Sequence, residues 1–208
     1  MSRIFLLSPA HCGGERARFL FNDATTFELA VRVREREGVP LGEIFTFLSG
    51  LYFRGKLAYA RAFARPPEGV PGVLIITAND GLRTPEHRVN LKTLRRYARG
   101  SIDEDNAGYR RPLLRDARLV GAAAGPGTEV VLLGSVASGK YVDVLLEIFG
   151  DRLRFPSTFV GRGDMSRGGL MLRSVDAGRE LDYVPVAGAV RHGPRPPRLE
   201  PRRWTRAR

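Results

Sequence analysis

Three glycine-containing segments carry the side chains that could take part in catalysis. In the first, residues 73–82 (VLIITANDGL), four apolar residues indicate a strand buried on both faces. The strand is followed by Asn79, Asp80 and Gly81. Because open α/β sheets bind ligands at the carboxyl ends of their strands, Asp80 is either a turn-forming residue or a catalytic acid.

The second segment fits the pattern of a phosphate-binding loop. Residues 134–140 (GSVASGK) match G-x-x-x-x-G-K between a predicted strand and a predicted helix. However, Tyr141 stands where a Ser or Thr would hold magnesium, and no clear metal-binding Asp follows. We therefore favour a loop that contacts one phosphate, or one that only turns the chain, over nucleotide hydrolysis.

The third segment, residues 161–169, is predicted to be a loop rich in glycine and arginine, with Asp164 as a second carboxylate. His11, Cys12 and His87 do not have the spacing of a zinc site, and we expect no metal and no cofactor. Cys12 could act as a nucleophile only if folding brought His87 to it, and a buried inert thiol is the favoured interpretation.

The alternation of strands and helices predicts a single α/β domain with three layers and a mostly parallel sheet. The domain should span residues 1–176, with residues 177–208 as a basic, mobile tail rich in Pro and Arg. Predicted strands are residues 3–7, 73–76, 129–133 and 153–160, and predicted helices are residues 25–37, 41–64 (with a break at 49–55), 90–99, 107–124 and 141–149.

The formal net charge of +12 over 208 residues favours a polyanionic partner, with nucleic acid first and an anionic membrane second. A general bias towards arginine would give the same charge without any partner. The basic tail would add affinity for phosphates that depends on salt. The chain has no apolar run of roughly 18 residues, so no membrane helix is expected. A single Cys and the absence of a recognisable signal segment favour the cytoplasm.

Several short blocks resemble the YaaA-type peroxide-stress proteins and their small bacterial relatives. The blocks are residues 8–10 (SPA), 44–55 (IFTFLSGLYFRG), 77–85 (TANDGLRTP), 133–141 (LGSVASGKY) and 164–173 (DMSRGGLMLR). The chain differs from that family at His11, Asn79, Asp80 and Lys140. The resemblance implies a cytoplasmic DNA-binding protein linked to DNA damage, and relatives of this type have been compared with base-handling glycosylases.

These features lead to the prediction of a DNA-binding protein that cleaves an N-glycosidic bond. A carboxylate can stabilise the cationic sugar and activate water, and Asp80 is the first choice for it, with Asp164 second. Asn79 would read a base edge, and Tyr52 and Tyr141 would offer aromatic surfaces to an extruded base.

Basic side chains around the opening, Arg54, Lys56, Lys140, Arg162 and Arg167, would bind phosphates. The residues expected to bind the substrate are Ser8, His11, Cys12, Tyr52, Arg54, Thr77, Ser135, Lys140, Tyr141, Arg162, Ser166 and Arg167. The alternatives are a non-catalytic DNA-binding stress-response protein and a nucleotide-binding protein with a phosphate-binding loop.

Overall fold

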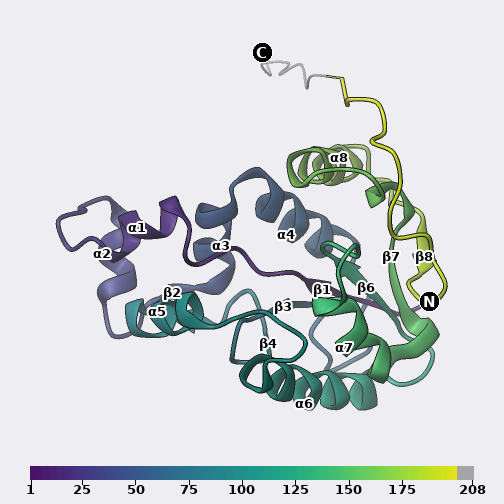
Figure 1. Ribbon diagram of the computed structural model, residues 1–208, viewed down its shortest axis with the longest axis horizontal. Coiled ribbons are helices and arrows are strands. Elements are labelled where there is room, and N and C mark those ends of the chain that lie inside the picture. The colour runs from purple at the N-terminus through teal and green to yellow at the C-terminus, as the bar shows by residue number, and fades with distance from the viewer. Residues whose placement is uncertain (201–208) are drawn as a thin grey trace.

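The centre of the computed structural model, which describes residues 1–200, is a six-stranded sheet (Figure 1). Four strands run parallel, and a short antiparallel strand lies at each edge. The order across the sheet is β4 (Leu82–Arg83), β3 (Val73–Ile76), β1 (Arg3–Leu7), β6 (Glu129–Leu133), β7 (Leu153–Pro156) and β8 (Tyr183–Pro185). The predicted α/β fold with a mostly parallel sheet is confirmed.

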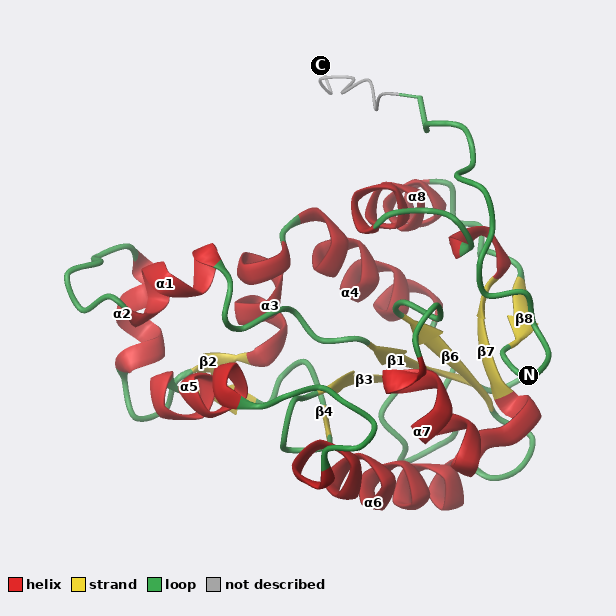
Figure 2. Ribbon diagram, in the orientation of Figure 1, coloured by secondary structure: helices red, strands yellow, loops and turns green. Residues whose placement is uncertain are grey.

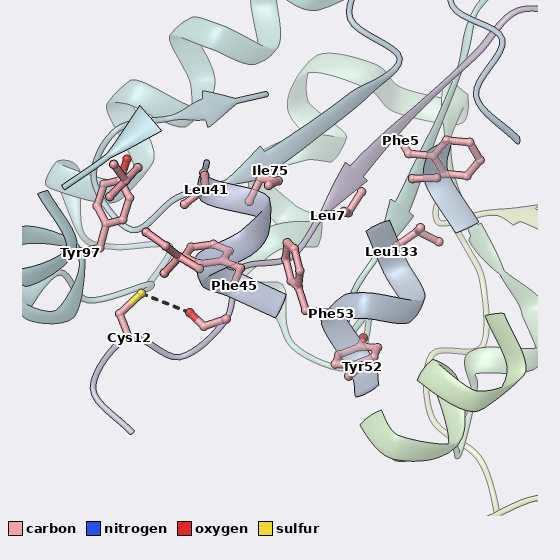
Figure 3. Packing of buried hydrophobic residues seen from close by; sticks show 14 of the residues in the cluster. Phe5, Leu7, Cys12, Leu41, Phe45, Tyr52, Phe53, Ile75, Tyr97 and Leu133 are labelled. Carbon is pink, nitrogen blue, oxygen red and sulfur yellow. Dashed lines mark hydrogen bonds between the residues drawn. The ribbon is translucent and has the colours of Figure 1, made fainter. Parts of the chain in front are cut away.

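The central strands are apolar at almost every position because both faces of the sheet are covered. In β1, Phe5 and Leu7 pack into one core, and Ile4 and Leu6 into the other. The first core lies under helices α3 (Leu41–Ser49), α4 (Leu51–Phe63) and α8 (Asp164–Asp176) (Figures 1 and 3). The second lies under α6 (Ala107–Ala124) and α7 (Gly139–Phe149).

Three further helices extend the molecule beyond the carboxyl ends of the parallel strands (Figure 2). They pack beside a small two-stranded antiparallel sheet. These elements are α1 (Glu15–Phe21), α2 (Glu28–Arg34), β2 (Val39–Pro40), β5 (Arg88–Val89) and α5 (Leu91–Arg99), and single 3₁₀ turns occupy Gly150–Arg152 and Ser157–Phe159. The helix predicted at residues 25–37 corresponds to the shorter α2, and α1 was not predicted.

Helices α4 and α8 touch through their backbones. A Cβ atom on Gly55 would lie 2.6 Å from the carbonyl oxygen of Gly168, and one on Gly168 would lie 2.8 Å from that of Leu51. The prediction of a loop at residues 161–169 is wrong from Asp164 onwards. Glycines lower the intrinsic helix propensity of this segment, but they also allow the close packing that stabilises it as a helix.

The ordered fold continues past residue 176, so the predicted domain boundary is too early. Glu180 forms ion pairs with Arg3, at 2.5 Å, and with Arg65, at 2.9 Å, and the Tyr183 hydroxyl lies 2.5 Å from that of Tyr59. Further on, the carbonyl oxygen of Pro197 accepts a hydrogen bond from Arg162. The last part of the predicted tail, residues 201–208, lies outside the described residues. Within residues 1–200, no helix has the length and apolar character needed to cross a membrane.

The contact between α4 and α8 predicts the outcome of adding single methyl groups. Gly55→Ala should lower the free energy of unfolding by about 1–3 kcal/mol, because the two backbones must separate. Gly169→Ala is the matched control, since its Cβ would meet Leu199 at an ordinary 3.7 Å and alanine favours the helix. Urea denaturation of both variants tests this, and equal stabilities would contradict it.

Candidate functional site

A pocket opens where the chain changes direction across the sheet. From β1 the chain passes through helices on one face and reaches β3, whereas β6, on the other side of β1, leads into α7 on the opposite face. Such a topological switch point is where α/β sheets bind ligands, outside the carboxyl ends of the strands. The cavity has a volume of about 490 Å³, within the usual range for small-molecule sites.

We call this cavity the switch-point pocket. Its lining comes from the loop after β1, the adjoining ends of α3 and α4, the segment after α5, the loop after β6 with the start of α7, and the start of α8. The residues are Ser8, Pro9, Ala10, His11, Ser49, Tyr52, Gly100, Ser101, Ile102, Ser135, Lys140, Tyr141 and Asp164. Four of them are serines, whose hydroxyl groups both donate and accept hydrogen bonds.

Asp164 provides the carboxylate of the switch-point pocket. It is the first residue of α8, and its side chain is 66% exposed. The guanidinium of Arg167, one helical turn later, lies 3.6 Å from the carboxylate and is itself held by two hydrogen bonds to the carbonyl oxygen of Phe159. Asp164 is therefore accessible to a ligand, while Arg167 is buried behind it.

Tyr52 and Lys56 reach the same region from one face of α4, four residues apart. Lys56 is fully buried, and its Nζ atom donates to the main-chain oxygen of Ser8 at 2.6 Å and lies 2.9 Å from the Ser8 Oγ. Burial lowers the pKa of Lys56 to about 7, although the negative charge of Asp164 partly offsets this. Lys56 therefore holds the loop after β1. The prediction that it binds phosphates at the opening is wrong, because its side chain is fully buried.

The Tyr52 hydroxyl is buried and has no hydrogen-bond partner among the described residues. Ser8 and Arg167 lie near it, but neither makes a hydrogen bond of acceptable geometry. Burial, reinforced by the charge of Asp164, raises the pKa of Tyr52 to about 12, so the hydroxyl keeps its proton. Because the hydroxyl oxygen is itself buried, a ligand in the neighbouring pocket would reach it only after a shift of the pocket wall.

Asp80, the first choice for the catalytic carboxylate, does not line the switch-point pocket. Its carboxylate is bonded to Arg83 at 3.2 Å, to Arg96 at 3.2 Å and to the Tyr97 hydroxyl at 3.0 Å. Burial alone would raise the pKa of Asp80, but Arg83, Tyr97 and Arg96 together keep it below its ordinary value. With its carboxylate held by these three side chains, Asp80 stabilises the turn after β3 and the packing of α5 against it.

The other predicted residues divide between the pocket and its surroundings. Ser8, His11, Tyr52, Ser135, Lys140 and Tyr141 line it. Cys12 lies in the hydrophobic core (Figure 3), where burial raises its pKa to about 12. The Thr77 hydroxyl donates to the carbonyl oxygen of Gly81. Arg54 is exposed on α4, and Arg162 and Ser166 lie beside the chain segment 195–200.

A second, basic cavity of about 720 Å³ lies along α5 and reaches the switch-point pocket at Gly100, which lines both. We call it the α5 groove. Lys92, Arg95 and Arg99 are exposed and recur at three- and four-residue spacing, so they share one face of the helix. The complete lining is Asn79, Asn90, Lys92, Thr93, Arg95, Arg96, Arg99 and Gly100.

The loop after β6 is unlike a phosphate-binding loop in its electrostatics. The start of α7 at Gly139 is covered by the carboxylates of Asp143 and Glu104, and a Cβ atom there would collide with both. Two negative charges therefore occupy the helix N-terminus, where a phosphate would otherwise be attracted.

Comparisons with known proteins place the chain in no group. No protein-family model, no curated protein and no solved structure matches it. The resemblance to the YaaA-type proteins therefore remains a prediction.

Lys56 lies behind the pocket and not at its opening, and Ser49 and Ser101 line the pocket without having been predicted to do so. The spacing of Tyr52 and Lys56 on a predicted helix was a usable signal, because residues four apart share a helix face. No local pattern marks Ser101, which joins the pocket because the segment after α5 passes the end of the sheet.

The burial of Lys56 predicts a specific pH dependence of stability. Its pKa is about 7 in the folded chain and 10.5 when unperturbed, so between these values the unfolded chain binds the proton more strongly. The free energy of unfolding should therefore rise from pH 7 to pH 10 relative to that of Lys56→Met, by on the order of 2–4 kcal/mol.

Urea denaturation at pH 7, 8.5 and 10 measures this difference. Lys92→Met, which removes an exposed lysine, is the control and should show no such trend relative to the wild type. If the difference in the free energy of unfolding between wild type and Lys56→Met stays constant with pH, the pKa of Lys56 is not lowered in the folded chain.

Proposed function

We propose that the protein binds nucleic acid, with DNA favoured over RNA, and cleaves the N-glycosidic bond of a base held in the switch-point pocket. The observation that carries this proposal is the position of Asp164. It places an accessible carboxylate beside serine hydroxyls and Lys140, at the carboxyl ends of β1 and β6.

The chemistry of the pocket suits this reaction. Breaking an N-glycosidic bond creates positive charge on the sugar, which the Asp164 carboxylate can stabilise while it orients or deprotonates a water molecule. The serine hydroxyls can bind a base edge or the sugar. Tyr52 and Tyr141 are only 6% and 5% exposed, so they leave little ring surface for stacking. Recognition would therefore rest on hydrogen bonds.

The α5 groove supports a polymeric substrate. Lys92, Arg95 and Arg99 form a continuous basic face that suits a phosphate backbone, whose binding is largely electrostatic. Because the groove meets the switch-point pocket at Gly100, a strand bound along α5 could place one nucleotide in the pocket.

The nucleotide-binding alternative finds less support. The carboxylates of Asp143 and Glu104 at the start of α7 would repel the phosphates that the loop would have to hold. A non-catalytic DNA-binding protein would use the same α5 groove, and the effect of replacing Asp164 on base release distinguishes it from the enzyme.

Asp164→Asn should abolish base release while leaving DNA affinity unchanged. Loss of the carboxylate is expected to slow the reaction by about 100-fold or more, because the amide can neither stabilise the cationic sugar nor accept a proton. Mass spectrometry of free bases, released from oligonucleotides that carry a panel of modified bases, measures the rate.

Asp80→Asn is the matched control. It should retain base release and instead lower the free energy of unfolding by about 1 kcal/mol, because its ion pairs are partly screened by solvent. A loss of activity in Asp80→Asn and not in Asp164→Asn would reverse the assignment. A wild-type protein that binds DNA but releases no base would favour the non-catalytic alternative.

The basic side chains of the α5 groove predict a salt-dependent contribution to DNA binding. Replacement of Lys92, Arg95 and Arg99 by alanine should weaken DNA binding and reduce the slope of log affinity against log salt by about 2–3, one phosphate contact being lost per residue. Fluorescence anisotropy between 50 and 300 mM salt measures both. Arg111→Ala, Arg115→Ala and Arg118→Ala on the exposed face of α6 form the control, and an equal effect there would indicate only a diffuse positive charge.

A further inference from the structure

A fully buried lysine is in contact with a pocket serine. The Nζ atom of Lys56 donates to the main-chain oxygen of Ser8 and lies 2.9 Å from its Oγ. Ser8 follows β1 directly and lines the switch-point pocket, whereas Lys56 does not. Burying an ammonium group is costly unless its surroundings compensate, so a lysine is an expensive way to hold one loop.

The surroundings of Lys56 allow it to exist with or without its proton. The rings of Tyr52 and Phe53 lie 4.3 and 4.9 Å from Nζ. Burial favours the neutral amine, Asp164 favours the ammonium and Arg167 opposes it, which brings the pKa to about 7. The ammonium can donate to both oxygens of Ser8. The neutral amine can still donate to the carbonyl and can accept the hydroxyl proton of Ser8.

We propose that Ser8 and Lys56 form a proton relay that protonates the leaving base in the switch-point pocket. This proposal rests on the proposed N-glycosidic cleavage. In this relay Ser8 is the catalytic residue, because it lines the pocket and its hydroxyl contacts Lys56. Lys56 is a positioning residue that acts only through Ser8.

The relay supplies the proton that the leaving base needs. The bond between the sugar carbon and the base nitrogen breaks, and its electron pair stays on the nitrogen, which takes the proton of the Ser8 hydroxyl. Ser8 takes a proton from the Lys56 ammonium and leaves it neutral. A water molecule bonds to the sugar carbon and gives its proton to Asp164. Asp164 then releases this proton to solvent, and Lys56 regains one from solvent. The products are the free base and the hydroxylated sugar.

Other titratable groups face the same space and must be separated from Lys56 in any pH profile. On the elements packed around it these are Tyr52, His11, Lys140, Tyr141, Asp164 and Arg167. Burial raises the pKa of Tyr52 and Tyr141, which keeps both protonated at neutral pH. Lys56→Met identifies the contribution of Lys56 directly, because methionine fills similar space without a charge.

The first measurement needs no substrate. In the protein labelled with ¹⁵N-lysine, the Nζ signal of Lys56, assigned by its absence in Lys56→Met, should titrate near pH 7. In Asp164→Asn the midpoint should be lower, because Asp164 favours the ammonium. A Lys56 that keeps its proton from pH 5.5 to pH 9 would overturn the relay, whatever the protein catalyses.

The second measurement is the rate of base release from pH 5.5 to pH 9, with oligonucleotides carrying the modified base that the wild type releases fastest. The wild-type rate should fall as Lys56 loses its proton. Ser8→Ala and Lys56→Met should each be about 100-fold slower and lack this ionisation. The double variant should be no slower than either single variant, because the two residues act as one unit.

The outcomes distinguish the relay from the function on which it rests. If Asp164→Asn is inactive while Ser8→Ala or Lys56→Met keeps the wild-type pH profile, the relay is wrong and the glycosidic function stands. Additive losses in the double variant would likewise overturn the relay. If the wild type releases no base from any oligonucleotide, both proposals fail.

Discussion

The direct backbone contact between α4 and α8 is the constraint on which the site depends. Gly55 and Gly168 let the two helices approach until main-chain atoms touch. This approach sets the Lys56 amine of one helix within electrostatic reach of the Asp164 carboxylate of the other. Any side chain larger than hydrogen at either glycine would separate the helices and so weaken the coupling between those charges.

The sequence was a sound guide to the sheet because the physical signal there is local. Each buried strand carries apolar residues facing two separate cores, and only a covered parallel sheet needs such a run. The same logic predicted that Ser8, Ser135 and Lys140 lie close together because each follows a parallel strand, and all three line the switch-point pocket. The start of α8 was missed, because its glycines argue against a helix until α4 is present as a neighbour.

Choosing between the two candidate carboxylates was beyond local reasoning. Asp80 also follows a parallel strand, and of its three partners only Arg83 is near it in the sequence. Arg96 and Tyr97 belong to the last turn of α5, and only the folded arrangement brings them to the carboxylate. Asp164 has one long ion pair and remains open to solvent. Predicting a catalytic acid therefore requires knowing which acids the fold has already neutralised.

The two ends of the sheet also differ in how completely their polar groups are paired. At the amino end, Arg3, Glu129 and Glu180 form close ion pairs that satisfy one another. At the carboxyl end, the buried hydroxyl of Tyr52 has no partner among the described residues, and the Lys56 amine contacts only the two oxygens of Ser8 and the faces of two aromatic rings. A buried hydroxyl without a partner reduces stability, so its presence beside the switch-point pocket supports the proposal that this edge of the sheet binds a ligand.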